Sequence, residues 1–171
     1  RAGQAVAVCP ALPCGRCREC RMGAENICTS LTAYGYEIDG GFAELIRVPR
    51  AFVEAGNVVP LPAGLPHELA ALAEPLACVI NGQDLLDLEP GQTVAVLGTG
   101  PIGLLHVMLA RQRGAARVIA VQRSAHRRAA ALELGADEAF SAEEAEGLAV
   151  DAAIVCIGSA DLANLAARMT R

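Results

Sequence analysis

A glycine-rich turn between an apolar run and a helical segment constrains the fold of this chain more than any other feature. The turn reads Gly98-Thr99-Gly100-Pro101-Ile102-Gly103. It follows Thr93–Leu97, which has the form of a strand buried on both faces, and it opens a helical pattern over 101–113. A strand, a G-x-G-x-x-G turn and a helix in this order form the pyrophosphate-binding corner of a parallel sheet. The alternative is a plain strand–helix turn.

Each glycine has its own task in such a corner. Gly98 makes the tight turn, Gly100 lets the backbone approach a pyrophosphate, and Gly103 lets the helix pack close to the strand. The helix N-terminus presents free N–H groups to phosphate, and Pro101 suits the first turn because no donor is needed there. The turn therefore predicts NADP or NAD as cofactor, bound by residues 98–103.

The chain after residue 91 repeats this strand–helix unit. Strands are expected at 93–97, 118–121, 139–140 and 152–157, and helices at 101–113, 125–134 and 161–168. This alternation indicates an α/β fold with a parallel sheet and right-handed crossovers. His106, on the apolar helix, is expected to pack rather than to react. The backbone at Cys156 follows a strand whose carboxyl end should face the nicotinamide.

The first half of the chain reads as short strands and loops. A strand is expected at 6–8, and the Gly40-Gly41 turn should run into an alternating strand that ends at Val48. A helical pattern covers 68–86, with a helix start or a kink at Pro75.

The residues after the second strand bear on the choice of cofactor. NAD sites usually place a carboxylate there to bond the ribose hydroxyls. This chain instead has Gln122 and Arg123, with Arg127 and Arg128 close behind. An arginine pairs with a 2′-phosphate through charge-assisted hydrogen bonds, which favours NADP. The alternative is that the arginines are solvated at a helix start while Gln122 bonds the ribose of NAD.

Four of the seven cysteines lie between residues 14 and 28: Cys14, Cys17, Cys20 and Cys28. Four thiolates complete the tetrahedral shell of zinc and leave no position for a substrate, so the spacing indicates a structural zinc site. An iron–sulfur cluster, a nucleic-acid zinc finger and ordinary buried cysteines are the alternatives. Cys9 and Cys78 are expected to be small core residues.

Composition excludes several other chemistries. All 14 basic residues are arginine, so no lysine is available for a P-loop or a Schiff base. The net charge of -5 and the 3% aromatic content argue against a nucleic-acid partner. No apolar run reaches about 18 residues, so no membrane span is expected. An odd cysteine count without a signal peptide argues against a disulfide framework, and a cytoplasmic location is expected.

Together the motifs resemble the zinc-containing medium-chain dehydrogenases, above all the sorbitol and threonine dehydrogenase branch. The matching segments are the cysteine lobe 14–28, Gly40-Gly41-Phe42-Ala43-Glu44, Glu74-Pro75-Leu76-Ala77 and the glycine turn 98–103. The resemblance implies a partial GroES-like catalytic domain of β-barrel type over residues 1–80. It further implies a truncated, doubly wound Rossmann domain over residues 81–171.

The same resemblance implies an activity. Family members transfer a hydride between a secondary alcohol or sugar alcohol and NAD(P), with a second, catalytic zinc as Lewis acid, and they form dimers or tetramers. Glu74 matches the glutamate that lies beside this zinc in the polyol branch; the alternative is that it caps the helix begun at Pro75. The family's other catalytic zinc ligands, a cysteine and a Gly-His-Glu element upstream of the lobe, have no match here.

This departure from the family pattern leads to two expectations. The chain is expected to be a fragment of a longer product and inactive as it stands. The rival hypothesis is a non-catalytic nucleotide-sensing module with a structural zinc knot, and the segment upstream of Arg1 would distinguish the two.

Overall fold

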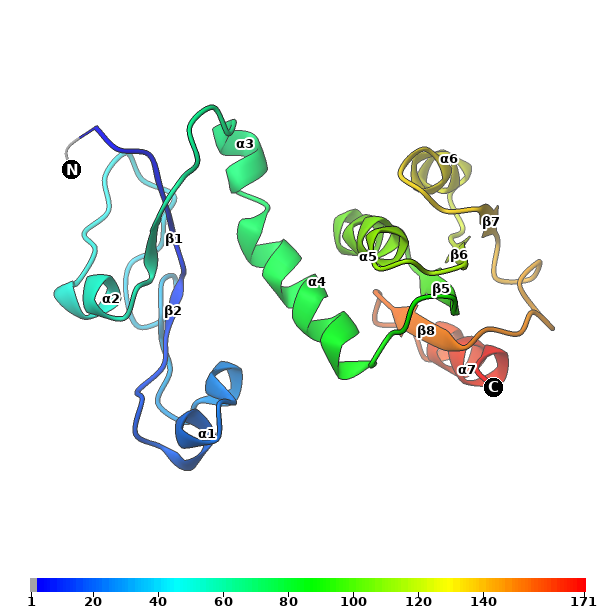
Figure 1. Ribbon diagram of the computed structural model, residues 1–171, viewed down its shortest axis with the longest axis horizontal. Helices are drawn as coiled ribbons and strands as arrows, with labels where there is room; N and C mark the ends of the chain where they lie inside the picture. Colours follow the sequence, from blue (N-terminus) through cyan, green and yellow to red (C-terminus); the bar gives the residue numbers. More distant parts are fainter. Residues whose placement is uncertain (1–2) are drawn as a thin grey trace. The chain divides into compact units, whose positions relative to one another are not determined.

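A computed structural model describes residues 3–171 of the protein. The chain folds into two compact units, a first that ends at Ala73 and a second that runs from Glu74 to Arg171 (Figure 1). The boundary expected after residue 80 therefore falls inside helix α4 (Ala73–Leu85).

The first unit consists of short elements with a very small core. β1 (Val6–Val8) pairs antiparallel with β4 (Val58–Pro60), and β2 (Ala11–Leu12) pairs antiparallel with β3 (Thr32–Ala33). The helices are α1 (Arg18–Arg21), the 3-10 helix η1 (Glu25–Ile27), α2 (Arg50–Glu54) and α3 (His67–Ala70). Among the residues described in this unit, Phe52 is the one fully buried large hydrophobic side chain. Its ring lies 5.1 Å from that of Tyr34.

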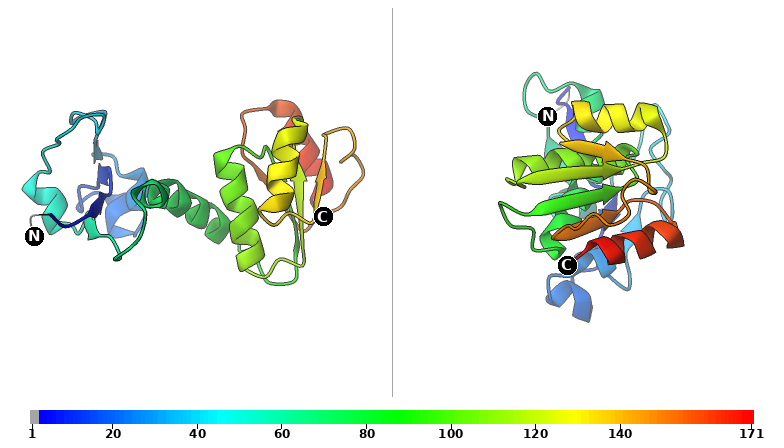
Figure 2. Two further views of the ribbon diagram at one scale, coloured as in Figure 1. Left: turned by 90° about the horizontal axis from the view of Figure 1, so that it is seen from above. Right: turned by 90° about the vertical axis from the view of Figure 1, so that its right-hand side faces the viewer.

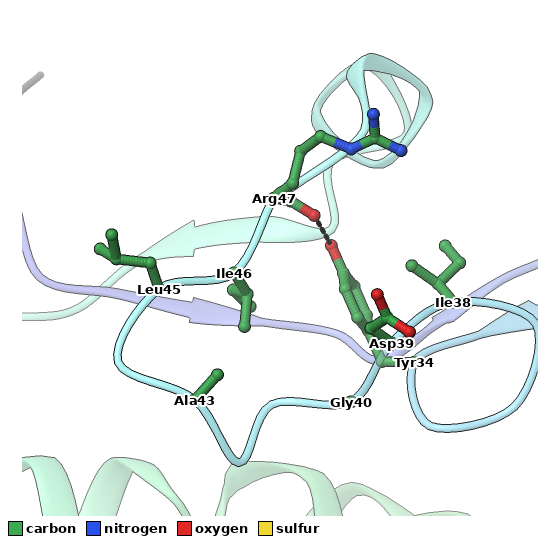
Figure 3. A pocket seen from close by; sticks show the side chains of 8 residues that line it. All are labelled: Tyr34, Ile38, Asp39, Gly40, Ala43, Leu45, Ile46 and Arg47. Carbon is green, nitrogen blue, oxygen red and sulfur yellow. Dashed lines mark hydrogen bonds between the residues drawn. The ribbon is translucent and has the colours of Figure 1, made fainter.

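The alternating strand expected after Gly40-Gly41 does not form. Residues 42–48 are irregular, and Phe42 and Leu45 are exposed. A strand needs a neighbouring strand to share its hydrogen bonds, and no strand within residues 3–171 pairs with this segment. Instead, the Tyr34 hydroxyl donates to the Arg47 carbonyl at 2.9 Å. The segment lines a pocket of about 300 Å³ (Figure 3).

The second unit is built on a parallel sheet in the order β7-β6-β5-β8. Its strands are β5 (Thr93–Leu97), β6 (Arg117–Val121), β7 (Glu138–Phe140) and β8 (Ala152–Val155). Its helices are α4, α5 (Pro101–Gln112), α6 (Ala125–Glu133) and α7 (Ala160–Met169). The chain runs outward from β5 to β7 and then crosses to β8 on the other side of β5, so the strand order reverses between β5 and β8.

Helices cover both faces of this sheet (Figure 2). Alternate residues of each strand point to opposite faces. Val94 and Val96 of β5 pack in the cluster that contains residues of α5 and α6. Ala95 and Leu97 pack in the cluster that contains residues of α7. The expected doubly wound parallel sheet is thereby confirmed, because both of its faces are buried and its central strands are apolar and buried after their first residues.

A buried polar pair fixes helix α4 against α5. The Gln83 side chain is fully buried, and its Nε2 donates to the His106 carbonyl at 2.9 Å and lies 3.3 Å from His106 Nδ1. His106 is itself buried, as expected for a packing residue. The ion pair between Arg113 and Asp84 (2.6 Å) joins the same two helices.

The helix start expected at Pro75 is confirmed, whereas the expectations for Cys9 and Cys78 need correction. The helical pattern over 68–86 forms two helices, α3 and α4, and Pro75 lies in the first turn of α4, where a missing N–H is tolerated. Cys9 and Cys78 were expected in the core but are both exposed. Their small apolar side chains fit a core, but no described element covers them.

The helices can also be compared with the thickness of a membrane. None of the helices within residues 3–171 has the length and apolarity needed to cross a lipid bilayer.

Candidate functional site

The four clustered cysteines converge on one point in the first unit. The Sγ–Sγ distances are 4.0 Å for Cys14 and Cys20, 3.3 Å for Cys17 and Cys20, and 3.9 Å for Cys17 and Cys28. All four sulfurs lie within 4.8 Å of one another. Four sulfurs bound tetrahedrally to zinc at about 2.3 Å lie about 3.8 Å apart. The cluster therefore has the dimensions of a tetrathiolate zinc site.

The local backbone stabilises negative charge on these sulfurs. The N–H groups of Cys17, Cys14 and Ser30 donate to cysteine sulfurs at 3.3–3.4 Å. Backbone hydrogen bonds from Arg16 and Cys17 lower the pKa of Cys14 to about 6. Burial and the neighbouring thiols raise the pKa of Cys20 to about 12. A bound cation is what would keep all four sulfurs ionised together, so the donor set fits a divalent metal.

The glycine-rich turn lies at the carboxyl end of β5, where the strand order reverses. Gly98 has a φ of 93°, in the left-handed region. A Cβ at Gly103 would lie 2.0 Å from the Gly98 carbonyl oxygen, so α5 packs too close for any other residue. A Cβ at Gly100 would meet nothing within 4 Å. The turn therefore leaves open space at the N-terminus of α5, as the approach of a pyrophosphate requires.

Hydrogen bonds hold this turn against the neighbouring strand ends. The Gly98 N–H donates to the Val121 carbonyl at 2.8 Å, and the Cys156 N–H donates to the Leu97 carbonyl at 2.8 Å. The Thr99 hydroxyl, which is buried, donates to the Arg127 carbonyl at 3.3 Å. Burial raises the pKa of the Cys156 thiol to about 11, so this sulfur is un-ionised at neutral pH.

The three residues predicted to determine the preference for NADP or NAD, Gln122, Arg123 and Arg127, lie after the end of β6. Gln122 Oε1 accepts from the Ser124 N–H at 3.3 Å. Arg123 and Arg127 are exposed, and among residues 3–171 neither forms an ion pair with a carboxylate. Arg128, which the sequence groups with these arginines, donates to the carbonyls of Gln122 and Arg123 at 2.8 and 2.9 Å.

Glu74 lies exposed in the first turn of α4. The thiol of Cys78, one turn later, donates to its Oε1 at 3.4 Å. Burial, and secondarily the Glu74 carboxylate, raises the pKa of Cys78. This pairing was missed from the sequence, although the i, i+4 spacing indicates it. The tetrathiolate lobe is the one group of three or more metal-binding side chains found within residues 3–171, and it does not include Glu74.

Two family models match opposite parts of the chain. The model of the alcohol dehydrogenase GroES-like domain matches residues 1–63, and the model of zinc-binding dehydrogenases matches residues 101–171. A D-altritol 5-dehydrogenase from Agrobacterium fabrum is 42% identical over 149 residues, which are 85% of this chain and 43% of that protein. An L-threonine 3-dehydrogenase from Bacillus licheniformis is 36% identical over 160 residues, 94% of this chain and 44% of that protein.

A solved structure agrees over nearly the whole chain. It is described as a zinc-binding dehydrogenase from Sinorhizobium meliloti 1021 bound to NADP. It has a TM-score of 0.91 and 38% identity, and the match covers 99% of this chain and 52% of that one. The chain thus spans less than half the length of the two curated relatives named above. These proteins are dehydrogenases and lend no support to a nucleotide-sensing module. With both domain models matched in order and the fold shared along its length, the chain belongs to the family of zinc-containing medium-chain dehydrogenases.

Proposed function

We propose that the whole protein is a zinc-dependent dehydrogenase that transfers a hydride between a secondary alcohol and NADP or NAD. Among secondary alcohols, we propose a sugar alcohol as the substrate. The observation that carries this proposal is that one chain holds both a tetrathiolate cluster and an open glycine corner at the switch point of a parallel sheet. The D-altritol relative supports the sugar-alcohol class.

Zinc at Cys14, Cys17, Cys20 and Cys28 would be structural. The four sulfurs fill a tetrahedral shell, so no position remains for a substrate. The first unit has little else to order it, since its core is small. Binding of structural zinc contributes about 10–16 kcal/mol in small peptides, which is enough to order such a lobe.

The residues of the second unit fit a dinucleotide with a 2′-phosphate. Residues 98–103 would face the diphosphate, with Gly100 leaving the space for it. At the ribose end, Gln122 Oε1 already accepts a hydrogen bond, so Gln122, Arg123 and Arg127 offer free donors and no free carboxylate. Donors suit a phosphate, whereas a ribose hydroxyl in NAD is usually bonded by an acidic acceptor. This donor set supports NADP over NAD.

Glu74 is proposed to lie beside the catalytic zinc, as the family resemblance implies. Cys78 is its one hydrogen-bond partner among residues 3–171, so these residues alone do not form a complete catalytic zinc site. The zinc would supply a Lewis acid for the alcohol oxygen. We also propose that the protein acts in the cytoplasm, where its seven free thiols stay reduced, as a homodimer or homotetramer.

The test is turnover by the whole, zinc-loaded protein with D-altritol, sorbitol and L-threonine, each with NADP⁺ and NAD⁺. We expect the absorbance of reduced nicotinamide to rise fastest with a sugar alcohol and NADP⁺. Failure to reduce either cofactor with any secondary alcohol would overturn the proposed activity. Turnover with a clear preference for NAD⁺ would overturn the cofactor assignment alone.

A further inference from the structure

Arg128 occupies an unusual place at the cofactor end of the sheet. It lies at the end of the first turn of α6, and its side chain reaches back to the residues that precede the helix. Its Nη1 donates to the carbonyl of Gln122 at 2.8 Å and to the carbonyl of Arg123 at 2.9 Å. A single guanidinium nitrogen thus holds two successive carbonyl oxygens of the loop between β6 and α6.

Other hydrogen bonds also hold the backbone of the loop between β6 and α6. The Gln122 N–H donates to the Phe140 carbonyl at 2.8 Å, which ties the loop to β7. The Ser124 N–H donates to Gln122 Oε1 at 3.3 Å. On the other side, the Thr99 hydroxyl holds the Arg127 carbonyl and so joins α6 to the glycine turn. The loop is therefore fixed from both sides, while the side chains of Arg123 and Arg127 remain exposed.

Arg128 itself is poorly placed to bind a ligand. Its side chain is half-buried and its Nη1 is used twice. Its charge also acts on Glu144, whose pKa is lowered first by a backbone hydrogen bond from Ser141 and in part by Arg128. The guanidinium instead offsets the partial negative charge of two carbonyl oxygens. Without it, those oxygens would be free at the point where a dianionic phosphate is expected to approach.

We propose that Arg128 is a positioning residue that sets the preference for a 2′-phosphorylated adenosine. It holds the carbonyls of Gln122 and Arg123 away from the phosphate and leaves Arg123 and Arg127 to bind it. This inference rests on the proposed use of NADP, and it adds a residue that acts through the loop rather than by contact with the cofactor.

The experiment compares two probes that differ at the 2′ position. Adenosine 2′,5′-bisphosphate and 5′-AMP are titrated calorimetrically into the full 171-residue chain and into Arg128→Met, which keeps the length of the side chain but removes its donors and charge. We expect the ratio of the two affinities to fall about tenfold, the size of one charge-assisted hydrogen bond. Arg128→Lys, which retains a charged donor, should restore part of the ratio.

The matched control is Arg168→Met on α7. Arg168 forms an exposed ion pair with Glu146 at 2.6 Å, so its loss removes one arginine charge without touching the loop. The control should leave the ratio unchanged. Hydrogen exchange at residues 122–124, measured without ligand, should accelerate in Arg128→Met and not in the control.

The outcomes separate the two proposals. If the wild-type chain prefers the bisphosphate and Arg128→Met weakens both probes equally, or neither, the positioning role is wrong while the use of NADP stands. If the wild-type chain shows no preference, the use of NADP fails, and the selectivity assigned to Arg128 fails with it. Unchanged exchange at residues 122–124 overturns the positioning role whichever cofactor binds.

Discussion

At the scale of single residues, the second and third glycines of the turn, Gly100 and Gly103, have different surroundings. Gly103 faces protein, because a Cβ there would lie 2.0 Å from the Gly98 carbonyl oxygen and 3.5 Å from Val96 Cγ1. Gly100 faces open space and has an ordinary φ of -75°. The fold therefore requires a glycine at position 103, whereas the fold leaves room for a side chain at position 100, where we expect the approach of a ligand to require glycine.

Gly103→Ala should accordingly reduce stability, whereas Gly100→Ala should reduce nucleotide binding. Gly103→Ala forces α5 away from β5 and should lower the free energy of unfolding by about 1–3 kcal/mol, the usual cost of overpacking. Gly100→Ala should leave stability nearly unchanged but weaken nucleotide binding, since its methyl group enters the space left for the diphosphate. Urea unfolding and calorimetric titration of each variant measure the two effects. Equal stability of both variants would contradict the packing role of Gly103.

The buried pair of Gln83 and His106 gives stability a dependence on pH. Burial lowers the pKa of His106 below its ordinary value of 6.5, so the folded state favours the neutral ring. The unfolded chain then binds more protons as pH falls, and stability present above pH 6.5 is lost between that value and the lower folded-state pKa.

Urea unfolding from pH 8 to pH 5 should therefore show a steeper acid loss for the wild type than for His106→Leu, whose side chain does not titrate. Gln83 keeps its bond to the backbone carbonyl in that variant. His126→Ser, at an exposed position, is the control and should follow the wild type. If the free energy of unfolding falls equally with pH in the wild type and in His106→Leu, His106 does not contribute to the pH dependence of stability.

At the scale of elements, the first unit contains helices too short to be stable alone. α1 has 4 residues and η1 has 3, whereas isolated helices below about 12 residues are marginal in water. Neither contains a buried side chain. The lobe between residues 14 and 28 therefore has no apolar core within these helices, and we expect zinc bound by its four sulfurs to order it.

Removal of zinc should consequently unfold this lobe selectively. After chelation, limited proteolysis should cut within residues 14–28 while the parallel sheet of the second unit stays protected. Cys17→Ser should reproduce the effect in the presence of zinc. Cys9→Ser should not, because Cys9 lies outside the cluster and its thiol contacts only the Ala11 carbonyl, at 3.7 Å. A lobe that resists protease without metal would show that it is not ordered by zinc.

The elements also show why the strands and helices of the second unit could be predicted from the sequence, whereas the strand expected before Val48 in the first unit could not. In the second unit, central strands buried on both faces appear as apolar runs, and glycines such as Gly114 and Gly135 close the helices with positive φ. Local signals therefore suffice there. The pattern of residues 42–48 is equally regular, but a strand forms only beside a partner, and pairing is not a local property. The bonds of Arg128 to the carbonyls of Gln122 and Arg123 likewise depend on the fold, whereas the i, i+4 spacing alone indicates the contact of Cys78 with Glu74.

At the scale of the whole molecule, the described residues contain some of the sites expected of a dehydrogenase and lack others. The described residues gather four thiols in a cluster that fits a metal ion, and they leave open space at the glycine turn. They do not assemble a second group of metal ligands around Glu74. The chain also spans less than half the length of its D-altritol and threonine dehydrogenase relatives. We therefore expect the isolated 171 residues to bind zinc and NADP without oxidising alcohols.

We expect the purified 171-residue chain to contain one zinc ion per chain by elemental analysis and to bind NADP. It should not oxidise alcohols, because a Lewis acid beside the alcohol oxygen needs ligands that these residues do not gather. Cys28→Ser should remove the zinc, whereas Glu74→Gln should leave the metal content unchanged, since Glu74 lies outside the tetrathiolate cluster. Two zinc ions per chain, with one lost in Glu74→Gln, would mean that Glu74 already belongs to a complete site. Measurable alcohol oxidation by the isolated chain would lead to the same conclusion.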